Sequence, residues 1–261
     1  MATALVALPA LVAFLLLAPP SLAVALIASA LAVGLVEFFG LLRMRGIRPL
    51  HGVGLFLATA LFVDVASPGL LALPLAPLGV LVLLTGTLRR GGDRESVTAA
   101  SATLLGAVYL GALGGSIAAL RLLAPVEEGA WRLLLLLVTV MASDTAAFFV
   151  GHALGRHPLA PKVSPAKSVE GALGGLVGGV LGVLAVRHLG LPGLPLGHAV
   201  ALGAAVAALG TVGDLEESLF KRWAGVKDSG TFLPGHGGML DRLDSLLFGA
   251  PLLYYYFAYA R

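Results

Sequence analysis

Hydrophobic and polar residues occur in alternating blocks along this chain. Long apolar stretches, most with enough residues to cross a ~30 Å hydrocarbon core as a helix, are separated by short polar breaks. The first stretch is short, but it lacks the basic segment with which signal peptides begin, so we expect it to be a retained helix. The pattern predicts about nine transmembrane helices, at residues 4–17, 21–42, 51–66, 69–88, 97–120, 131–151, 170–189, 197–220 and 243–259.

Composition agrees with a bilayer as the solvent. Hydrophobic residues make up 58% of the 261-residue chain and charged residues 12%, whereas a soluble domain carries about 25% charged residues. A single core cannot bury that much apolar surface. The absence of cysteine excludes disulfides, thiolate metal sites and a cysteine nucleophile, and the formal charge of +3 does not indicate a nucleic-acid-binding surface. The expected fold class is all-α, a polytopic membrane protein.

Basic residues are concentrated in alternate polar breaks. Thirteen of the 17 lysines and arginines follow the second, fourth, sixth and eighth predicted spans, within residues 43–48, 89–94, 156–167 and 221–242. Basic loops stay in the cytoplasm. We therefore predict a multi-pass protein of the cell (inner) membrane, with its N-terminus and these four loops in the cytoplasm. With a wrong number of spans, these basic residues would have been distributed over both sides of the membrane.

Glycines repeat at a spacing of four residues in the seventh predicted span. They form two interleaved series, Gly171, Gly175 and Gly179, and Gly174, Gly178 and Gly182. Small residues at this spacing let helix backbones approach closely in lipid. We interpret the series as a packing surface rather than a phosphate-binding loop.

Ionisable side chains inside apolar spans are costly and usually have a task. The sixth, eighth and ninth predicted spans contain or begin with four aspartates, Asp144, Asp214, Asp241 and Asp244. Glu217 and Ser218 share the helix face of Asp214. Any one carboxylate alone could instead pair with an arginine or cap a helix. Several near one membrane face would repel one another, and Mg²⁺, which binds one or two carboxylates with water and phosphates, would relieve that repulsion.

Basic residues and a glycine-rich segment accompany these carboxylates. The neighbouring cations are Lys162, Lys167, Lys221, Arg222, Lys227 and Arg242. Residues 234–238 read Pro-Gly-His-Gly-Gly, which cannot form regular helix and leaves backbone N–H groups free to meet an anion. His236 has three roles open to it: carrying a proton, orienting a phosphate, or a structural one. Carboxylates suit a metal ion, lysines and arginines suit phosphate, and glycines let the backbone approach a ligand closely. Together they indicate a metal–nucleotide site near the cytoplasmic face.

Two segments carry a resemblance to a known family. One contains Ser218-Leu-Phe-Lys221-Arg222, Lys227-Asp228 and His236-Gly-Gly-Met-Leu-Asp241-Arg242-Leu-Asp244, and the other contains Asp144-Thr-Ala-Ala-Phe and Ser164-Pro-Ala-Lys167-Ser168-Val-Glu170-Gly171. They resemble the signatures of the phosphatidate cytidylyltransferases, also called CDP-diacylglycerol synthases. The second segment departs from the family at Ala166, Ser168, Val169 and His152, where lysine, threonine, tryptophan and arginine are usual.

The resemblance implies an all-helical membrane fold, a Mg²⁺-dependent reaction and a cytoplasmic funnel open to lipid. The implied reaction transfers the cytidylyl group of CTP to phosphatidic acid, giving CDP-diacylglycerol and pyrophosphate for phospholipid biosynthesis. The resemblance further implies metal binding by Asp214 and Asp241, with Asp144 and Asp244 nearby. The implied catalytic residues are Asp214, Asp241, Lys167 and Lys227. The expected substrate-binding residues are Ser164, Lys167, Ser168, Ser218, Lys221, Arg222, Lys227, Gly235, His236, Gly237, Gly238 and Arg242.

The predicted organisation has two regions. Residues 1–130 form an N-terminal region of about five spans, and residues 131–261 form a C-terminal catalytic region that carries the motifs. A CTP-dependent lipid kinase, or a cytidylyltransferase for another lipid phosphate, would need a similar site. A secondary transporter is a further alternative, against which the lack of a convincing internal repeat counts. The expected partners are CTP, phosphatidic acid and the lipid bilayer, with no nucleic acid; a homodimer is among the oligomeric states left open.

Overall fold

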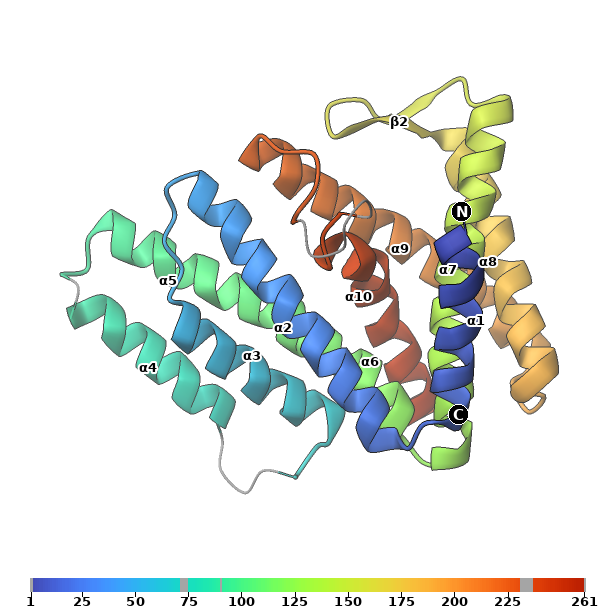
Figure 1. Ribbon diagram of the computed structural model, residues 1–261, viewed down its shortest axis with the longest axis horizontal. Helices are drawn as coiled ribbons and strands as arrows, with labels where there is room; N and C mark the ends of the chain where they lie inside the picture. The colour runs from blue at the N-terminus through green and yellow to red at the C-terminus, as the bar shows by residue number, and fades with distance from the viewer. Residues whose placement is uncertain (1, 71–74, 90, 231–236, 261) are drawn as a thin grey trace.

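The protein is a bundle of α-helices with one small β-hairpin (Figure 1). The computed structural model describes residues 2–70, 75–89, 91–230 and 237–260. In chain order the α-helices are α1 (Ala2–Leu17), α2 (Pro20–Met44), α3 (His51–Ala66), α4 (Leu75–Arg89), α5 (Arg94–Gly106), α6 (Leu113–Leu122), α7 (Gly129–Leu154), α8 (Val169–Gly190), α9 (Leu196–Ala224) and α10 (Leu240–Tyr255). The other elements are the π-helical turns η1 (Ala107–Ala112) and η3 (Tyr256–Ala260), the 3₁₀ turn η2 (Val126–Glu128), and the strands β1 (Pro158–Ala160) and β2 (Ser164–Ser168).

Each predicted apolar stretch overlaps a helix, so the helical fold class is confirmed for the described residues. Residues 71–74 of the fourth stretch lie outside them. Within the described residues, five helical segments are long and apolar enough to cross a membrane, namely Pro20–Met44, Arg94–Leu122, Val126–Leu154, Val169–Gly190 and Leu196–Ala224. The chain is therefore a multi-pass membrane protein. Helices α3 and α4 have 16 and 15 residues, which at ~1.5 Å per residue is short of a ~30 Å core. That all nine stretches cross the membrane stays a prediction.

The ends of the helices form two sides. The α2–α3 turn, the end of α4, the hairpin after α7 and the end of α9 lie along the upper and left side of Figure 1. The C-terminal ends of α1, α3, α6 and α8 lie along the opposite side, as does the marked C-terminus. The concentration of basic residues therefore follows a real division of the molecule.

Three arginines on the opposite side donate hydrogen bonds to backbone carbonyl oxygens. Arg121 donates to the carbonyl oxygens of Val126 and Ala18, at 3.2 and 3.3 Å. Arg132, which is 1% exposed, donates to the Ala124 carbonyl at 3.2 Å, and Arg187 donates to the Leu194 carbonyl at 2.6 Å. These guanidinium groups satisfy backbone carbonyls at helix ends and connections, which otherwise lack partners in apolar surroundings.

Glycines set the distance between α7 and α8. A Cβ on Gly178 would lie 2.5 Å from the Ala142 carbonyl oxygen, and one on Gly174 would lie 2.6 Å from the Val150 side chain. Gly179 faces the next helix instead, where an added Cβ would lie 2.9 Å from the Gly203 carbonyl oxygen of α9. The interpretation of the glycine series as a packing surface is therefore confirmed.

A similar contact joins α9 to α10. A Cβ on Gly213 would lie 2.5 Å from the carbonyl oxygen of Asp244. Because Asp214 follows Gly213 directly, this close approach brings the carboxylates of the two helices to the same place in the bundle.

The hairpin is the clearest departure from the predicted helices and loops. Strands β1 and β2 pair antiparallel, with Pro158 opposite Ser168 and an irregular register. Pro158, Pro161 and Pro165 lie within this segment, and proline lacks the N–H that a helix interior needs. The hairpin projects beyond the ends of α7 and α8 (Figure 1), and Ser168 caps α8 by accepting from the Gly171 N–H at 3.1 Å.

Candidate active site

Three aspartates from three helices meet at the close contact of α9 and α10. Asp144 of α7 and Asp244 of α10 each interact electrostatically with Asp214 of α9, and with one another. Asp244 is buried, and Asp214 is partly exposed. Carboxylates that repel one another in this way favour a positive charge beside them.

A lysine from the hairpin supplies part of that charge. Lys167, on β2, forms an ion pair with Asp214, and the Ser218 hydroxyl lies 3.4 Å from the other oxygen of that carboxylate. The side chains of Lys167 and Asp214 are 26% and 34% exposed, so this pair is open to a ligand. The hairpin thus brings Lys167, a cation of the 152–169 segment, into contact with a carboxylate of α9.

A second, more buried ionic group lies one turn further along α9. The Lys221 ammonium group pairs with Glu217 of the same helix and with Asp241 of α10, the latter at 2.6 Å. Glu217 is 1% exposed, and its Oε1 has no hydrogen-bond partner among the described residues. Lys221 also interacts electrostatically with Asp244, which links the two ionic groups.

The other oxygen of Asp241 holds the loop that precedes α10. It accepts from the Ser229 N–H at 3.1 Å, the Ser229 hydroxyl at 2.9 Å and the Gly238 N–H at 2.7 Å. Gly237 has φ of +80°, a left-handed conformation that favours glycine, so the expected non-helical backbone is confirmed at this position. Asp241 is therefore an anchor for the loop in this conformation, and its predicted role as a metal ligand stays a prediction.

The remaining predicted residues lie around this centre. Arg222 is exposed in the last turn of α9, with its Nε 3.4 Å from the Val163 carbonyl oxygen in the hairpin. Lys227 and Arg242 are exposed, on the loop after α9 and in the first turn of α10, and Ser164 is partly exposed on β2. Ser168 has the structural role of helix cap. Gly235 and His236 lie outside the described residues.

Two side chains near the site were given no role by the sequence analysis. Glu37 of α2 lies against the loop before α10 and accepts from the Leu240 N–H. Tyr109 lies in η1, is buried, and has a hydroxyl without a hydrogen-bond partner among the described residues. It interacts electrostatically with Asp244 and Glu217. An acidic residue inside an apolar span was a readable signal for Glu37, whereas the π-helical turn that carries Tyr109 has no such signal in the sequence.

The carboxylate oxygens of Asp144, Asp214 and Asp244 are donors of the kind that Mg²⁺ prefers. Among the described residues, no group of three or more histidine, cysteine, aspartate or glutamate side chains is arranged to hold a metal ion. Mg²⁺ commonly uses only one or two carboxylates and completes its shell with water and substrate phosphates. Asp214, with Asp144 or Asp244 beside it, offers oxygen ligands of this kind on a partly exposed surface.

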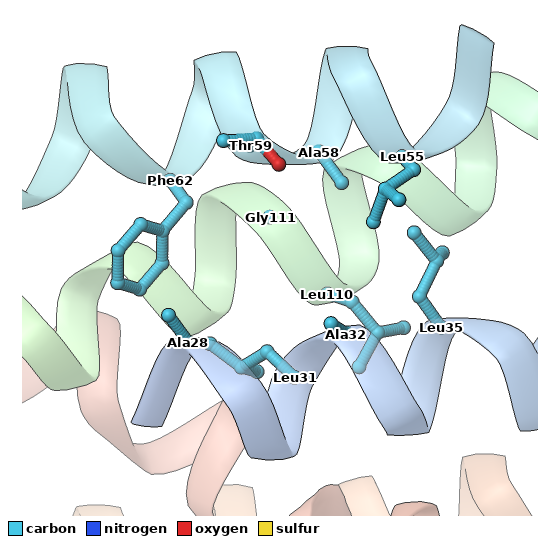
Figure 2. A pocket seen from close by; sticks show the side chains of 10 residues that line it. All are labelled: Ala28, Leu31, Ala32, Leu35, Leu55, Ala58, Thr59, Phe62, Leu110 and Gly111. Carbon is cyan, nitrogen blue, oxygen red and sulfur yellow. The ribbon is translucent and has the colours of Figure 1, made fainter. Parts of the chain in front are cut away.

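A pocket elsewhere in the molecule lacks this chemistry. It lies between α2, α3 and η1, and Figure 2 shows that the side chains of Leu31, Leu55 and Phe62 are among those that line it. None of its lining residues is charged, so it offers nothing to hold a nucleotide phosphate. Gly111 belongs to a tight contact there, since a Cβ on it would lie 2.4 Å from the Ala58 carbonyl oxygen.

The fold and the site together define a multi-pass helical membrane protein with clustered carboxylates and lysines at the end of the bundle. A family model described as "Cytidylyltransferase family" matches residues 1–260. The chain therefore belongs to the cytidylyltransferase family, and the resemblance seen in its motifs is confirmed.

Individual relatives are similar over different parts of the chain. The chain is 33% identical over 235 residues to a phosphatidate cytidylyltransferase of Bacillus subtilis, a match that covers 87% of this chain and 86% of the relative. It is 42% identical over 134 residues to one of Haemophilus influenzae, covering 50% of this chain and 46% of the relative. It is also 38% identical over 193 residues to the uncharacterized protein YnbB of Escherichia coli, covering 73% and 63%. The chain thus spans about half to two thirds of the length of the last two relatives.

Proposed function

We propose that this protein transfers the cytidylyl group of CTP to phosphatidic acid, forming CDP-diacylglycerol and releasing pyrophosphate. The observation that carries the proposal is the ion pair between Lys167 and Asp214, with Asp144 and Asp244 beside it. It puts a cation suited to phosphate next to carboxylates suited to metal, at a partly exposed place. The names of the Bacillus subtilis and Haemophilus influenzae relatives support phosphatidate as the acceptor.

Asp214, together with Asp144 and Asp244, would hold Mg²⁺ in this proposal. When bound, the ion would neutralise charge on the phosphate oxygens. Asp241 would join as a ligand only if Lys221 and Ser229 released its oxygens, and we therefore assign it first to holding the loop.

The reaction needs no strong base, because a phosphate oxygen of phosphatidic acid is already anionic. That oxygen attacks the α-phosphorus of CTP, a new P–O bond forms, and the bond from the α-phosphorus to the bridging oxygen of pyrophosphate breaks. The main obstacle is repulsion between two polyanions. Lys167, Lys227, Arg222 and Arg242 would bind phosphates and hold the reactants in line, which lowers that repulsion where charge develops.

The position of the site suits a lipid substrate. Lys167 lies on β2, whose hairpin is on the side of the bundle to which the basic connections belong (Figure 1), and it pairs with Asp214. This side would face the cytoplasm and its CTP. The acyl chains of phosphatidic acid would stay among the apolar helix faces while the headgroup reaches the carboxylates. The catalytic loops would then be cytoplasmic in a cell-membrane protein.

The experiment that tests the proposal is pyrophosphate release by the purified protein in detergent micelles. Release is expected only when CTP, phosphatidic acid and Mg²⁺ are all present. A CTP-dependent lipid kinase would release CDP instead, and a transporter would release neither product. Either of these results would refute the proposed reaction.

A further inference from the structure

Glu37 is an acidic residue in the apolar helix α2, far in the sequence from the motifs that carry the proposed chemistry. Burying a carboxylate in such a helix is costly unless the group is well satisfied and has a task. Its neighbours in space come from the loop before α10 and from α10 itself. The N-terminal half of the chain therefore contributes a charged group to the region of the candidate site.

Glu37 caps α10 from a different helix. Its Oε2 accepts from the Leu240 N–H at 2.8 Å, and Leu240 is the first residue of α10. Met239, at the N-cap position of that helix, provides no side-chain cap. A carboxylate at a helix N-terminus satisfies an otherwise unpaired N–H and interacts favourably with the helix dipole. Glu37 thus stabilises the end of α10 that bears Asp241.

Gly230 and Gly238, in the described parts of the loop, lie close against this carboxylate. A Cβ on Gly230 would lie 2.3 Å from Glu37 Oε1, and a Cβ on Gly238 would lie 2.6 Å from Oε2. Neither position tolerates a side chain while Glu37 stays in place. Oε1 is buried and has no hydrogen-bond partner among the described residues, so only Oε2 makes polar contacts. Glycine at positions 230 and 238 lets the loop backbone come close enough to Glu37 for its carboxylate to reach the start of α10.

Glu37 and Asp241 hold the same loop from two sides. The Ser229 hydroxyl lies 2.9 Å from Asp241 Oδ2 and 3.4 Å from Glu37 Oε2, and the Gly238 N–H donates to Asp241. Moving Glu37 would therefore disturb Ser229, the start of α10 and, through both, the Asp241 carboxylate.

We propose that Glu37 is a positioning residue, which fixes the start of α10 and the loop before it so that Asp241 and Asp244 are held in their working orientation. The proposal rests on the function proposed above. Because Glu37 acts through the loop and not on substrate, its loss should lower kcat and leave the KM for CTP nearly unchanged.

The activity test compares Glu37→Ala and Glu37→Gln with wild type. Glu37→Ala is expected to lower kcat roughly 10- to 100-fold, with KM for CTP within about threefold. Glutamine retains the accepting oxygen and replaces only Oε1, which has no hydrogen-bond partner among the described residues, so Glu37→Gln should restore kcat to within about fivefold of wild type. The control is Glu95→Ala, an exposed glutamate in the first turn of α5, which should behave as wild type.

A readout independent of activity is hydrogen exchange of residues 237–244, measured without substrate. Exchange should be faster in Glu37→Ala, and unchanged in Glu37→Gln and Glu95→Ala. Gly230→Ala should reproduce the exchange of Glu37→Ala, whereas Gly52→Ala, where a Cβ meets nothing within 4 Å, should not.

The proposal is overturned if Glu37→Ala keeps wild-type kcat, even with a lower melting temperature, or if exchange of residues 237–244 stays at the wild-type rate. If wild type itself does not use CTP and phosphatidic acid, the proposed function fails. The exchange data would then decide separately whether Glu37 holds the loop.

Discussion

At the scale of single residues, the site depends on a lysine with two competing partners. Lys167 pairs with Asp214 in the structure, yet the proposed reaction requires it to bind phosphate. Pairing with Asp214 and binding phosphate both use the positive charge of the Lys167 ammonium group. A phosphate that binds next to Asp214 would find this group already in position. A role in membrane topology alone would instead make Lys167 interchangeable with other basic residues on its side of the protein.

Lys167→Ala is expected to lower kcat/KM roughly 10- to 100-fold. Loss of a charge-assisted contact costs about 1.5–3 kcal/mol, and ~1.4 kcal/mol corresponds to a factor of ten. Arg94→Ala is the matched control, since Arg94 is exposed at the start of α5 and belongs to no motif. The measurement is CDP-diacylglycerol formation in micelles, with both variants checked for equal expression and melting temperature. Equal small effects would leave Lys167 with a topological role only.

Sequence reasoning singled out Lys167 and Asp214, which the structure brings into contact, and gave no role to the side chains that pack around the candidate site. Asp214 and Lys167 were predictable because an acid in an apolar span and a lysine in a recognisable motif are readable along the chain. The partner of Lys221 within its own helix, Glu217, was placed on the right face but given no task. Glu37 lies about two hundred positions from the loop it holds, and one sequence without structure does not show which distant segments meet.

At the scale of elements, the position of the site follows from how closely three helices approach. Glycines on α8 and α9 allow α7, α8 and α9 to pack with little side-chain volume between them. This packing positions Asp144 and the hairpin next to Asp214. The contact between α7 and α8 should therefore be sensitive to the addition of a single methyl group.

Gly178→Ala is expected to destabilise the protein by about 1–3 kcal/mol, because its Cβ would overlap the Ala142 carbonyl oxygen and the Ala146 side chain. Gly197→Ala, at an open position on α9 where a Cβ meets nothing within 4 Å, should leave stability unchanged or slightly higher. Melting temperature in detergent measures both. A Gly178→Ala protein as stable as wild type would show that α7 and α8 have room to separate.

The helices were predictable from the length of apolar stretches, and the hairpin was not. The predicted third span, 51–66, coincides with α3, because a run of apolar residues bounded by polar ones leaves little choice. The 152–169 segment contains several prolines and no long apolar run, so its prediction stopped at a polar loop. Its short strands, β1 and β2, depend on pairing with each other, which alternation of side chains did not indicate.

At the scale of the whole molecule, orientation in the membrane decides which substrates can reach the site. The hairpin lies on the basic side of the bundle, and η2 lies between α6 and α7 on the other (Figure 1). We predict that the basic side faces the cytoplasm, because lysines and arginines are retained there during insertion.

Single cysteines test this orientation without background, since the chain contains none. The two variants are Lys162→Cys and Glu127→Cys. Lys162 lies in the hairpin and Glu127 in η2, and both residues are exposed. In intact cells a membrane-impermeant thiol reagent should label Glu127→Cys and spare Lys162→Cys, and both should react after the membrane is opened. Labelling of Lys162→Cys in intact cells would place the candidate site on the wrong face for cytoplasmic CTP.

The central claim is that the α-phosphoryl group of CTP, with its cytidine, moves onto phosphatidic acid. The most direct measurement follows CTP labelled either at the α-phosphorus or at the γ-phosphorus, with purified protein, Mg²⁺ and phosphatidic acid in micelles. The α-label should enter the lipid fraction and the γ-label should appear only in pyrophosphate, while Asp214→Asn and Asp241→Asn should give no labelled lipid. Entry of the γ-label into lipid, or no transfer of either label by the folded wild-type protein, would contradict the claim.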